Sequence, residues 1–242
     1  MKSFVKHIVE PARLLLAWQP SDAHRRRRYI VGEITRNRDD VTLTYLRDSS
    51  DFNKAKECGF DGYPAFKKTD NDYSIGVIDA FMRRLPPRSR GDFEKYLDLL
   101  RIPVDTVISD FALLGYSGAK LPSDGFSIIH PFDNVCGPCE FLLEVAGFRY
   151  VNNVSIEDIA SGDEAVFVPE PENEYDPRAV RIEIDNKKIG YVNRGQVEAM
   201  HRWIRDEYII HAFVERLNGS QERPMVYLYV EILPAPLVAQ TG

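Results

Sequence analysis

Cysteine is scarce in this sequence, with three residues in a chain of 242. That number argues against a disulfide-stapled secreted domain, which needs many cysteines in a short chain. Long apolar runs are missing too: no segment approaches the ~20 residues that cross a bilayer, and Lys2, Lys6, Glu10 and Arg13 interrupt the first stretch. We therefore expect a soluble, cytoplasmic protein with one large or two small domains and no membrane partner.

The signatures of common enzyme classes are also absent from the sequence. It holds no phosphate-binding P-loop, no GxSxG nucleophile turn and no HExxH zinc motif. Its five histidines are scattered, and His201 falls on a predicted amphipathic helix, where a surface residue is commoner than a ligand. We therefore predict a non-enzymatic protein without a cofactor.

Basic residues are in short supply as well. The chain has 31 Lys+Arg against 37 Asp+Glu, a net charge of −6. Residues 1–139 hold 21 basic and 19 acidic residues, or +2, whereas residues 140–242 hold 10 and 18, or −8. Because phosphate neutralisation dominates non-specific affinity for DNA, the second part is unsuited to broad nucleic-acid binding. DNA binding there has to be short-range and local.

Two of the three cysteines form a recognisable motif. The run Cys136-Gly137-Pro138-Cys139 spells the redox motif of thioredoxin-type proteins. In those proteins a helix follows the motif and lowers the thiol pKa, whereas a β-like run follows here. One such pair supplies two zinc ligands, and no second pair completes a zinc ribbon. We favour a structural junction, while a metal site with distant ligands and a redox site remain open.

The most informative stretch is residues 147–194, where three short motifs follow one another. The first is Gly147-Phe148-Arg149-Tyr150 at one strand end, the second is the loop 170–180 with its Tyr-Asp-Pro run, and the third is residues 188–194 before a helix. Aromatic and arginine side chains can grip a base and a phosphate. A carboxylate accepts hydrogen bonds and suits a hydroxyl. This combination favours the end of a strand over a duplex backbone.

These motifs resemble the HIRAN domain family over roughly residues 139–235. The resemblance implies an OB-related β-barrel with a helix that holds the 3′-hydroxyl end of single-stranded DNA. In that interpretation Asp176 accepts the 3′-hydroxyl proton, Tyr175 and Tyr150 contact terminal nucleotides, and Arg149 lies on a phosphate or base. The full set of predicted nucleic-acid-binding residues is Arg149, Tyr150, Tyr175, Asp176, Tyr191 and Arg194.

Each of these residues also has a structural interpretation. Asp176 before Pro177 is a natural turn former, and Arg194 could be a solvated residue at the start of the helix 195–206. An Arg-Tyr pair such as 149–150 is common on protein surfaces. Acidic side chains crowd the same loop and oppose DNA unless they point away; they are Glu170, Glu172 and Glu174.

The first part of the chain predicts strands followed by helices. Residues 13–18, 29–34 and 41–45 are short β-like runs separated by polar turns. Residues 78–85 are helical in pattern and stop at a Pro-Pro pair. Asp92 is placed to cap a second helix through Leu100, and a third is predicted from Val104 to Leu114.

This part resembles the N-terminal domain of HipA-type toxin kinases over roughly residues 11–130. The resemblance rests on Val31-Gly32-Glu33-Ile34, Leu43-Thr44-Tyr45, residues 81–86 and residues 111–120. No kinase catalytic-loop signature occurs in the chain. The resemblance therefore implies an accessory domain that docks on a HipA-type kinase or a sibling toxin component.

Two further features have alternative interpretations. The basic run Arg25-Arg26-Arg27-Arg28 is either a solvated hairpin tip, which we favour, or a contact for nucleic acid or an acidic partner. The aromatic loop 60–66 either packs internally, which we favour, or faces a kinase.

Together these observations predict an α+β protein with two domains. Residues 1–135 form a HipA-N-like strand and helix domain, and residues 136–242 form the HIRAN-type β-barrel with a helix. The predicted function is a two-domain adaptor that binds single-stranded DNA 3′-ends and docks on a HipA-type kinase. The alternative is an antitoxin-like protein-interaction module without DNA binding. We predict no metal site.

Overall fold

The computed structural model describes residues 3–21, 27–38, 40–121, 124–133, 135–220 and 223–235, without the side chain of residue 223. The chain divides into two units. We call Val9–Leu100 with Val104–Phe132 the N-terminal unit, and Met1–Ile8, Arg101–Pro103 and Asp133–Gly242 the C-terminal unit. The sequence predicts one domain boundary, between residues 135 and 136. Two residues of the basic run, Arg25 and Arg26, lie outside the described residues.

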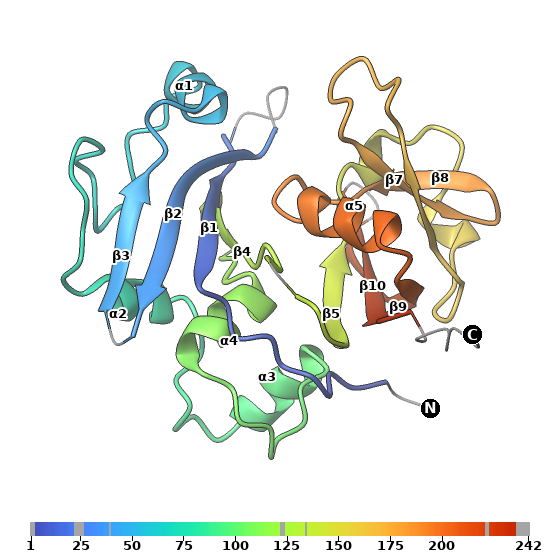
Figure 1. The fold of residues 1–242 in the computed structure, drawn as a ribbon, viewed down its shortest axis with the longest axis horizontal. Coiled ribbons are helices and arrows are strands. Elements are labelled where there is room, and N and C mark those ends of the chain that lie inside the picture. Colours follow the sequence, from blue (N-terminus) through green and yellow to red (C-terminus); the bar gives the residue numbers. More distant parts are fainter. Residues whose placement is uncertain are drawn as a thin grey trace, which may run out of the picture. The chain divides into compact units, whose positions relative to one another are not determined.

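The N-terminal unit is built on one antiparallel sheet with the strand order β3-β2-β1-β4 (Figure 1). The strands are β1 (Arg13–Trp18), β2 (Tyr29–Asn37), β3 (Asp40–Tyr45) and β4 (Phe126–Ile129). The first three confirm the predicted strands; β3 alternates along a half-buried sheet, whereas β1 is an apolar run with four consecutive buried residues. The fourth was not predicted, since it has four residues, which are all buried and show no alternation.

Four helices accompany this sheet: α1 (Ser50–Glu57), α2 (Val77–Met82), α3 (Phe93–Leu99) and α4 (Asp110–Ser117). The predictions for α2 and α3 are confirmed within a few residues, but Asp92 precedes α3 without a capping hydrogen bond from its side chain. The prediction that the next helix starts at Val104 is wrong. Ser109 caps α4 by accepting a hydrogen bond from the amide of Ala112, and Val107 before it is 94% exposed.

The aromatic loop packs internally, as favoured from the sequence. Phe60, Tyr63 and Phe66 are buried. The Tyr45 hydroxyl donates to the carbonyl of Phe66 at 2.6 Å and accepts from the amide of Tyr63 at 2.8 Å. Burial raises the pKa of Tyr45 to about 12. The loop is therefore tied to β3 by a satisfied buried hydroxyl.

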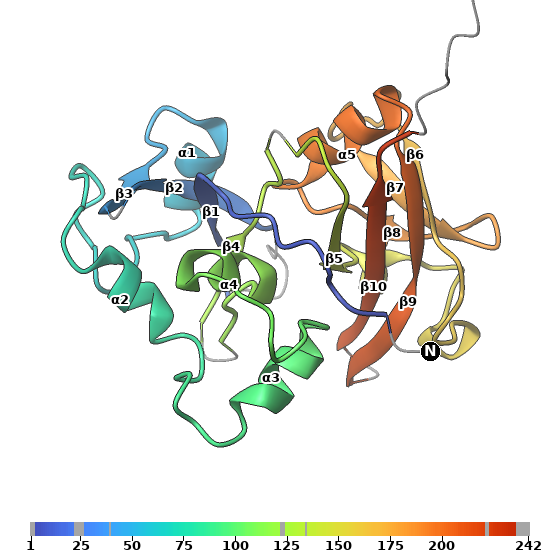
Figure 2. The same ribbon diagram turned by 60° about the horizontal axis from the view of Figure 1, so that its bottom comes forward.

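The described residues of the C-terminal unit form two three-stranded antiparallel sheets. Figure 2 shows the long pair β9 and β10 beside β5. One sheet has the order β5-β10-β9 and the other β6-β7-β8. Their bounds are β5 (Cys139–Glu144), β6 (Val166–Pro169), β7 (Val180–Ile184), β8 (Lys187–Tyr191), β9 (Ile209–Ser220) and β10 (Arg223–Leu233), with the helix α5 (Val197–Arg205) between β8 and β9.

The prediction of a closed β-barrel is wrong for the described residues. The two sheets are linked by single bridges, Ala146 to Tyr191 and Glu164 to Phe213, and not by continuous strand pairing. The coarser prediction of a mixed fold of helices and strands is confirmed. The β-like run after the cysteine motif and the helix after Arg194 are also confirmed, as β5 and α5.

Candidate nucleic-acid interface

The loop between β6 and β7 is organised by Asn173. Its Oδ1 accepts hydrogen bonds from the amides of Tyr175 at 3.0 Å and Asp176 at 3.1 Å. The base of the loop is closed by the amide of Glu170, which donates to the carbonyl of Ala179 at 2.8 Å. This turn leaves the Tyr175 ring 89% exposed. A large aromatic face presented to solvent can stack on a base.

Two arginines flank the carboxylate of Asp176. Arg178 Nε lies 3.6 Å from Asp176 Oδ1, and Arg194 Nε lies 3.7 Å from Oδ2. The amide of Arg178 also donates to Oδ1 at 3.1 Å. The carboxylate is about one quarter exposed. It therefore keeps some access to solvent between two groups of opposite charge, and its oxygens can accept a hydrogen bond from a ligand.

Tyr191 is tied to the same loop through its hydroxyl. The hydroxyl donates to Glu170 Oε2 at 3.0 Å and accepts from Asn173 Nδ2 at 3.1 Å. Lys188 Nζ also bonds to this hydroxyl and lies 4.2 Å from the centre of the ring. Tyr191 therefore positions the loop, and its predicted contact with DNA stays a prediction.

Of the acidic residues that crowd the loop, Glu170 is bound within the protein. Burial alone would raise its pKa, but hydrogen bonds from Asn173, Tyr191 and Arg181, with the charge of Lys188, hold the pKa below its usual 4.5. Glu172 and Glu174 differ, since both are exposed. The electrostatic repulsion of DNA expected from the sequence therefore comes from the carboxylates of Glu172 and Glu174.

The first motif is joined to Tyr191 through the backbone. Ala146 and Tyr191 exchange two backbone hydrogen bonds of 2.8 and 2.9 Å. Gly190 makes this approach possible: its φ is +148°, and a Cβ there would lie 2.5 Å from the carbonyl oxygen of Ala146. The bridge fixes the chain directly before Arg149 and Tyr150.

Arg149 and Tyr150 belong to a short 3-10 helix, η1 (Phe148–Tyr150), and not to a strand end as the sequence suggested. Gly147, with φ +80°, starts this turn. The Arg149 guanidinium lies 4.5 Å from the centre of the Tyr150 ring and donates to its hydroxyl. Tyr150 is 63% exposed. The pair thus presents one aromatic face covered by a cation.

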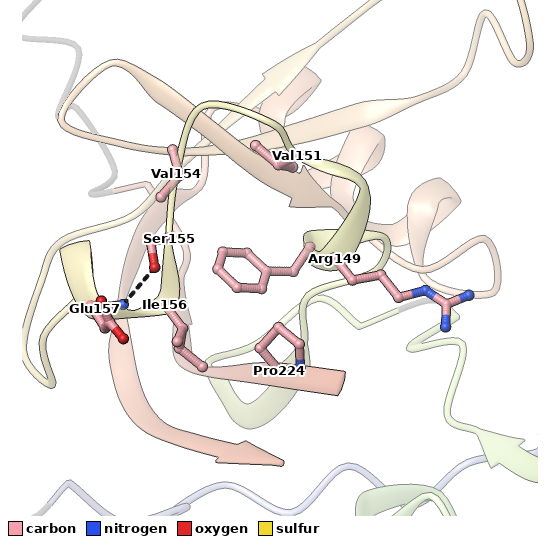
Figure 3. A pocket seen from close by; sticks show the side chains of 8 residues that line it. Arg149, Val151, Val154, Ser155, Ile156, Glu157 and Pro224 are labelled. Carbon is pink, nitrogen blue, oxygen red and sulfur yellow. Dashed lines mark hydrogen bonds between the residues drawn. The ribbon is translucent and has the colours of Figure 1, made fainter. Parts of the chain in front are cut away.

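A pocket of about 340 Å³ lies next to this pair (Figure 3). In Figure 3 the side chain of Arg149 extends away from the other labelled lining residues. Most of the lining is apolar, with Arg149, Ser155 and Glu157 as polar members; the apolar residues are Phe148, Val151, Val154, Ile156 and Pro224.

The structure brings some of the predicted residues together. Asp176 contacts Arg194, and Tyr191 is bonded to Asn173, which positions Tyr175. Arg149 and Tyr150 contact each other. Sequence reasoning missed the positioning role of Asn173, although an asparagine two residues before an exposed turn residue is a known turn signal. It also missed Arg178, whose contacts come from the distant helix α5.

The cysteine motif does not have the surroundings of a redox site. Cys139 lies buried in β5, and burial with the nearby Glu140 raises its pKa to about 12. Cys136 is exposed, and both thiols are free. Among the described residues, no group of three or more His, Cys, Asp or Glu side chains could hold a metal ion. These features favour the structural junction.

Comparison with known proteins finds a family match within the C-terminal unit. Residues 139–232 match the HIRAN domain family, which is known for DNA binding and has an OB-like β fold. This confirms the HIRAN prediction for that part of the chain. No curated protein matches the chain. The comparisons lend no support to the HipA-type resemblance of residues 1–135, which stays a prediction.

Two solved structures are similar to part of the chain. The HIRAN domain of human HLTF has 18% identity and a TM-score of 0.33, covering 38% of this chain and 74% of its own. A protein from Lactobacillus plantarum has 20% identity and a TM-score of 0.34, covering 40% and 97%. Within the described residues, every helix is too short or too polar to cross a membrane.

Proposed function

We propose that the C-terminal unit binds the free 3′-hydroxyl end of single-stranded DNA. The observation that supports this most is the pairing of an exposed Tyr175 ring with the partly exposed Asp176 carboxylate on one ordered turn. The ring offers a stacking surface to the terminal base. The carboxylate offers an acceptor to the terminal hydroxyl, which an internal nucleotide lacks.

The remaining residues take supporting roles in this proposal. Arg194, which lies beside Asp176, attracts the phosphate of the terminal nucleotide. Arg149 and Tyr150 contact the nucleotide before it, with the ring as a stacking face and the guanidinium on a phosphate. Tyr191 holds the Asp176 loop in place through Asn173. Because residues 140–242 carry a charge of −8, these contacts supply the affinity locally.

Competition between linear and circular DNA tests the end-binding proposal. A fluorescent single strand is bound to the protein and displaced with unlabelled strands of the same sequence. One competitor is linear with a 3′-hydroxyl, and the other is closed into a circle without ends. We expect the linear strand to compete at least tenfold better. Equal competition would show binding along the strand and contradict recognition of an end.

A second candidate is an antitoxin-like protein-interaction module without DNA binding. It is favoured by the acidity of the C-terminal unit and by the exposed carboxylates of Glu172 and Glu174 beside Tyr175. Like charges oppose a phosphate backbone at short range. If neither strand binds at low salt, this candidate replaces the first.

For the N-terminal unit we propose, on resemblance alone, a docking role without catalysis. Its partner would be a HipA-type kinase or a sibling toxin component. Co-expression of the full chain with such a kinase and purification through a tag on the kinase tests this. Retention of the chain at equal stoichiometry is expected, and loss of the chain during washing would contradict the docking role.

A further inference from the structure

We propose that Arg178 is a phosphate-binding residue of the DNA-end site, and that Glu198 occupies its guanidinium while no DNA is bound. This inference rests on the function proposed above and adds a residue that the sequence motifs did not indicate. Arg178 follows Asp176 by two positions, so it stands within one turn of the carboxylate assigned to the terminal hydroxyl.

The first support is the fixed position of Arg178. His201 Nε2 lies 2.8 Å from the carbonyl oxygen of Arg178. A carbonyl only accepts, so Nε2 is the donor in this bond. The side chain is held as well, because Nη1 donates to Glu198 Oε1 at 2.8 Å. Glu198 and His201 are three residues apart on α5 and therefore share one helix face. The helix thus holds both the backbone and the head group of Arg178.

The second support is the local charge. Asp176 alone would repel the phosphate that every terminal nucleotide carries on its 5′ side. Arg178 and Arg194 lie 3.6 and 3.7 Å from its two oxygens, so these three groups together carry +1. Glu198 brings the sum back to zero. Within an acidic unit, release of Arg178 from Glu198 therefore creates a small positive site beside the hydroxyl acceptor.

The third support is the ease of that exchange. The side chains of Arg178 and Glu198 are 60% and 68% exposed. Exposed ion pairs of this kind contribute little stability. A guanidinium has five N–H donors in a planar fork that matches the oxygens of a phosphate. A phosphate can therefore displace Glu198 without unfolding any element, and the carboxylate then returns to solvent.

The proposal predicts opposite effects for the two partners of the ion pair. Arg178→Ala should weaken binding of a 3′-hydroxyl single strand about three- to tenfold. It should also reduce the slope of log K against log salt by about 0.7, the value for one single-strand phosphate. Glu198→Gln should strengthen binding about two- to fivefold. Arg178→Lys should keep the salt slope, because it keeps the charge, but lose part of the affinity.

The matched control is Arg205→Ala. Arg205 is an exposed arginine on α5, the helix that carries Glu198, and its guanidinium pairs with Asp206 at 2.8 Å. It should change neither affinity nor slope. Fluorescence anisotropy over a salt series with all five proteins makes the test, and thermal melts verify folding. An unchanged salt slope in Arg178→Ala, with wild-type protein bound normally, overturns the inference alone. Weaker binding by Glu198→Gln overturns the competing role of Glu198. Absence of wild-type binding overturns the proposed function itself.

Discussion

At the scale of single residues, Asn173 decides the shape of the candidate site. Its side chain bonds to two loop amides, to Glu170 and to the hydroxyl of Tyr191. An amide side chain can do this because it has donors and an acceptor together. Aspartate has no N–H donors and could not donate hydrogen bonds to the oxygens of Glu170 and Tyr191. This explains why position 173 is asparagine. The exposed Tyr175 and the partly exposed Asp176 therefore depend for their positions on a residue that need not touch DNA.

We expect Asn173→Ala to lower the free energy of unfolding by about 1–3 kcal/mol, because it removes several partly buried hydrogen bonds at once. Binding of a 3′-hydroxyl strand should fall together with stability, since Tyr175 loses its fixed position. Urea denaturation and anisotropy measure the two effects. The control is Asn152→Ala at an exposed position. Unchanged stability in Asn173→Ala would contradict the organising role.

The cysteines provide a second test at this scale. Burial keeps the Cys139 thiol protonated at pH 8, because its pKa is raised to about 12, while Cys136 is exposed. Since the thiolate is the reactive form, iodoacetamide should label Cys136 in the native protein and leave Cys139 unlabelled. Both should react after denaturation. Peptide mass mapping measures the difference, and native labelling of Cys139 would contradict a structural role.

At the scale of elements, the sequence patterns located most strands and helices but not their exact limits. β3 alternates in and out of a half-buried sheet, and that alternation is visible in the sequence, whereas β1 is marked by a short apolar run with four consecutive buried residues. The start of α4 was misplaced because Val104 and Val107 continue an apolar pattern although both are exposed. The cap at Ser109 was the better signal.

The close approach of Gly190 in β8 to Ala146 can be tested by substitution. In Gly190→Ala the new Cβ meets the carbonyl oxygen of Ala146 and the side chain of Val145, each at 2.5 Å, with φ at +148°. Strain and overpacking together should cost roughly 2–4 kcal/mol of unfolding free energy. The backbone bridge between Tyr191 of β8 and Ala146, which precedes Arg149, should weaken as well. Thermal and urea unfolding measure the loss.

Gly137→Ala is the matched control for this substitution, because a Cβ at Gly137 would have no heavy atom within 4 Å in the described part of the chain apart from its two chain neighbours. Its stability should match that of the unaltered protein. A Gly190→Ala protein as stable as this control would contradict the close approach of β8 to Ala146, and with it the connection between the two motifs.

At the scale of the whole molecule, the sequence motifs predict the family of the C-terminal part more specifically than that of the N-terminal part. The three motifs of the C-terminal part are specific, because each contains Gly, Tyr or Asp at positions where the backbone or the proposed DNA end requires that residue. Residues 139–232 match the HIRAN family accordingly. The N-terminal motifs were mostly hydrophobic pattern with Gly and Pro, which many folds share. The sheets of the C-terminal unit could not be foreseen, since bridges such as Glu164 to Phe213 join distant residues.

The negative charge of residues 140–242 restricts the DNA contacts that the proposed function can use. With −8 on residues 140–242, DNA affinity has to come from a few short contacts at a strand end and not from a wide basic surface. Recognition of the end therefore depends on the terminal hydroxyl itself. A terminal phosphate in the same place would bring its charge against Asp176.

The most direct measurement is fluorescence anisotropy with two short single strands that differ at one group, a 3′-hydroxyl or a 3′-phosphate, at low and moderate salt. We predict at least tenfold tighter binding of the hydroxyl end, and loss of that preference in Asp176→Ala. Equal binding of both ends, or a preference that survives in Asp176→Ala, would contradict recognition of a strand end by this unit.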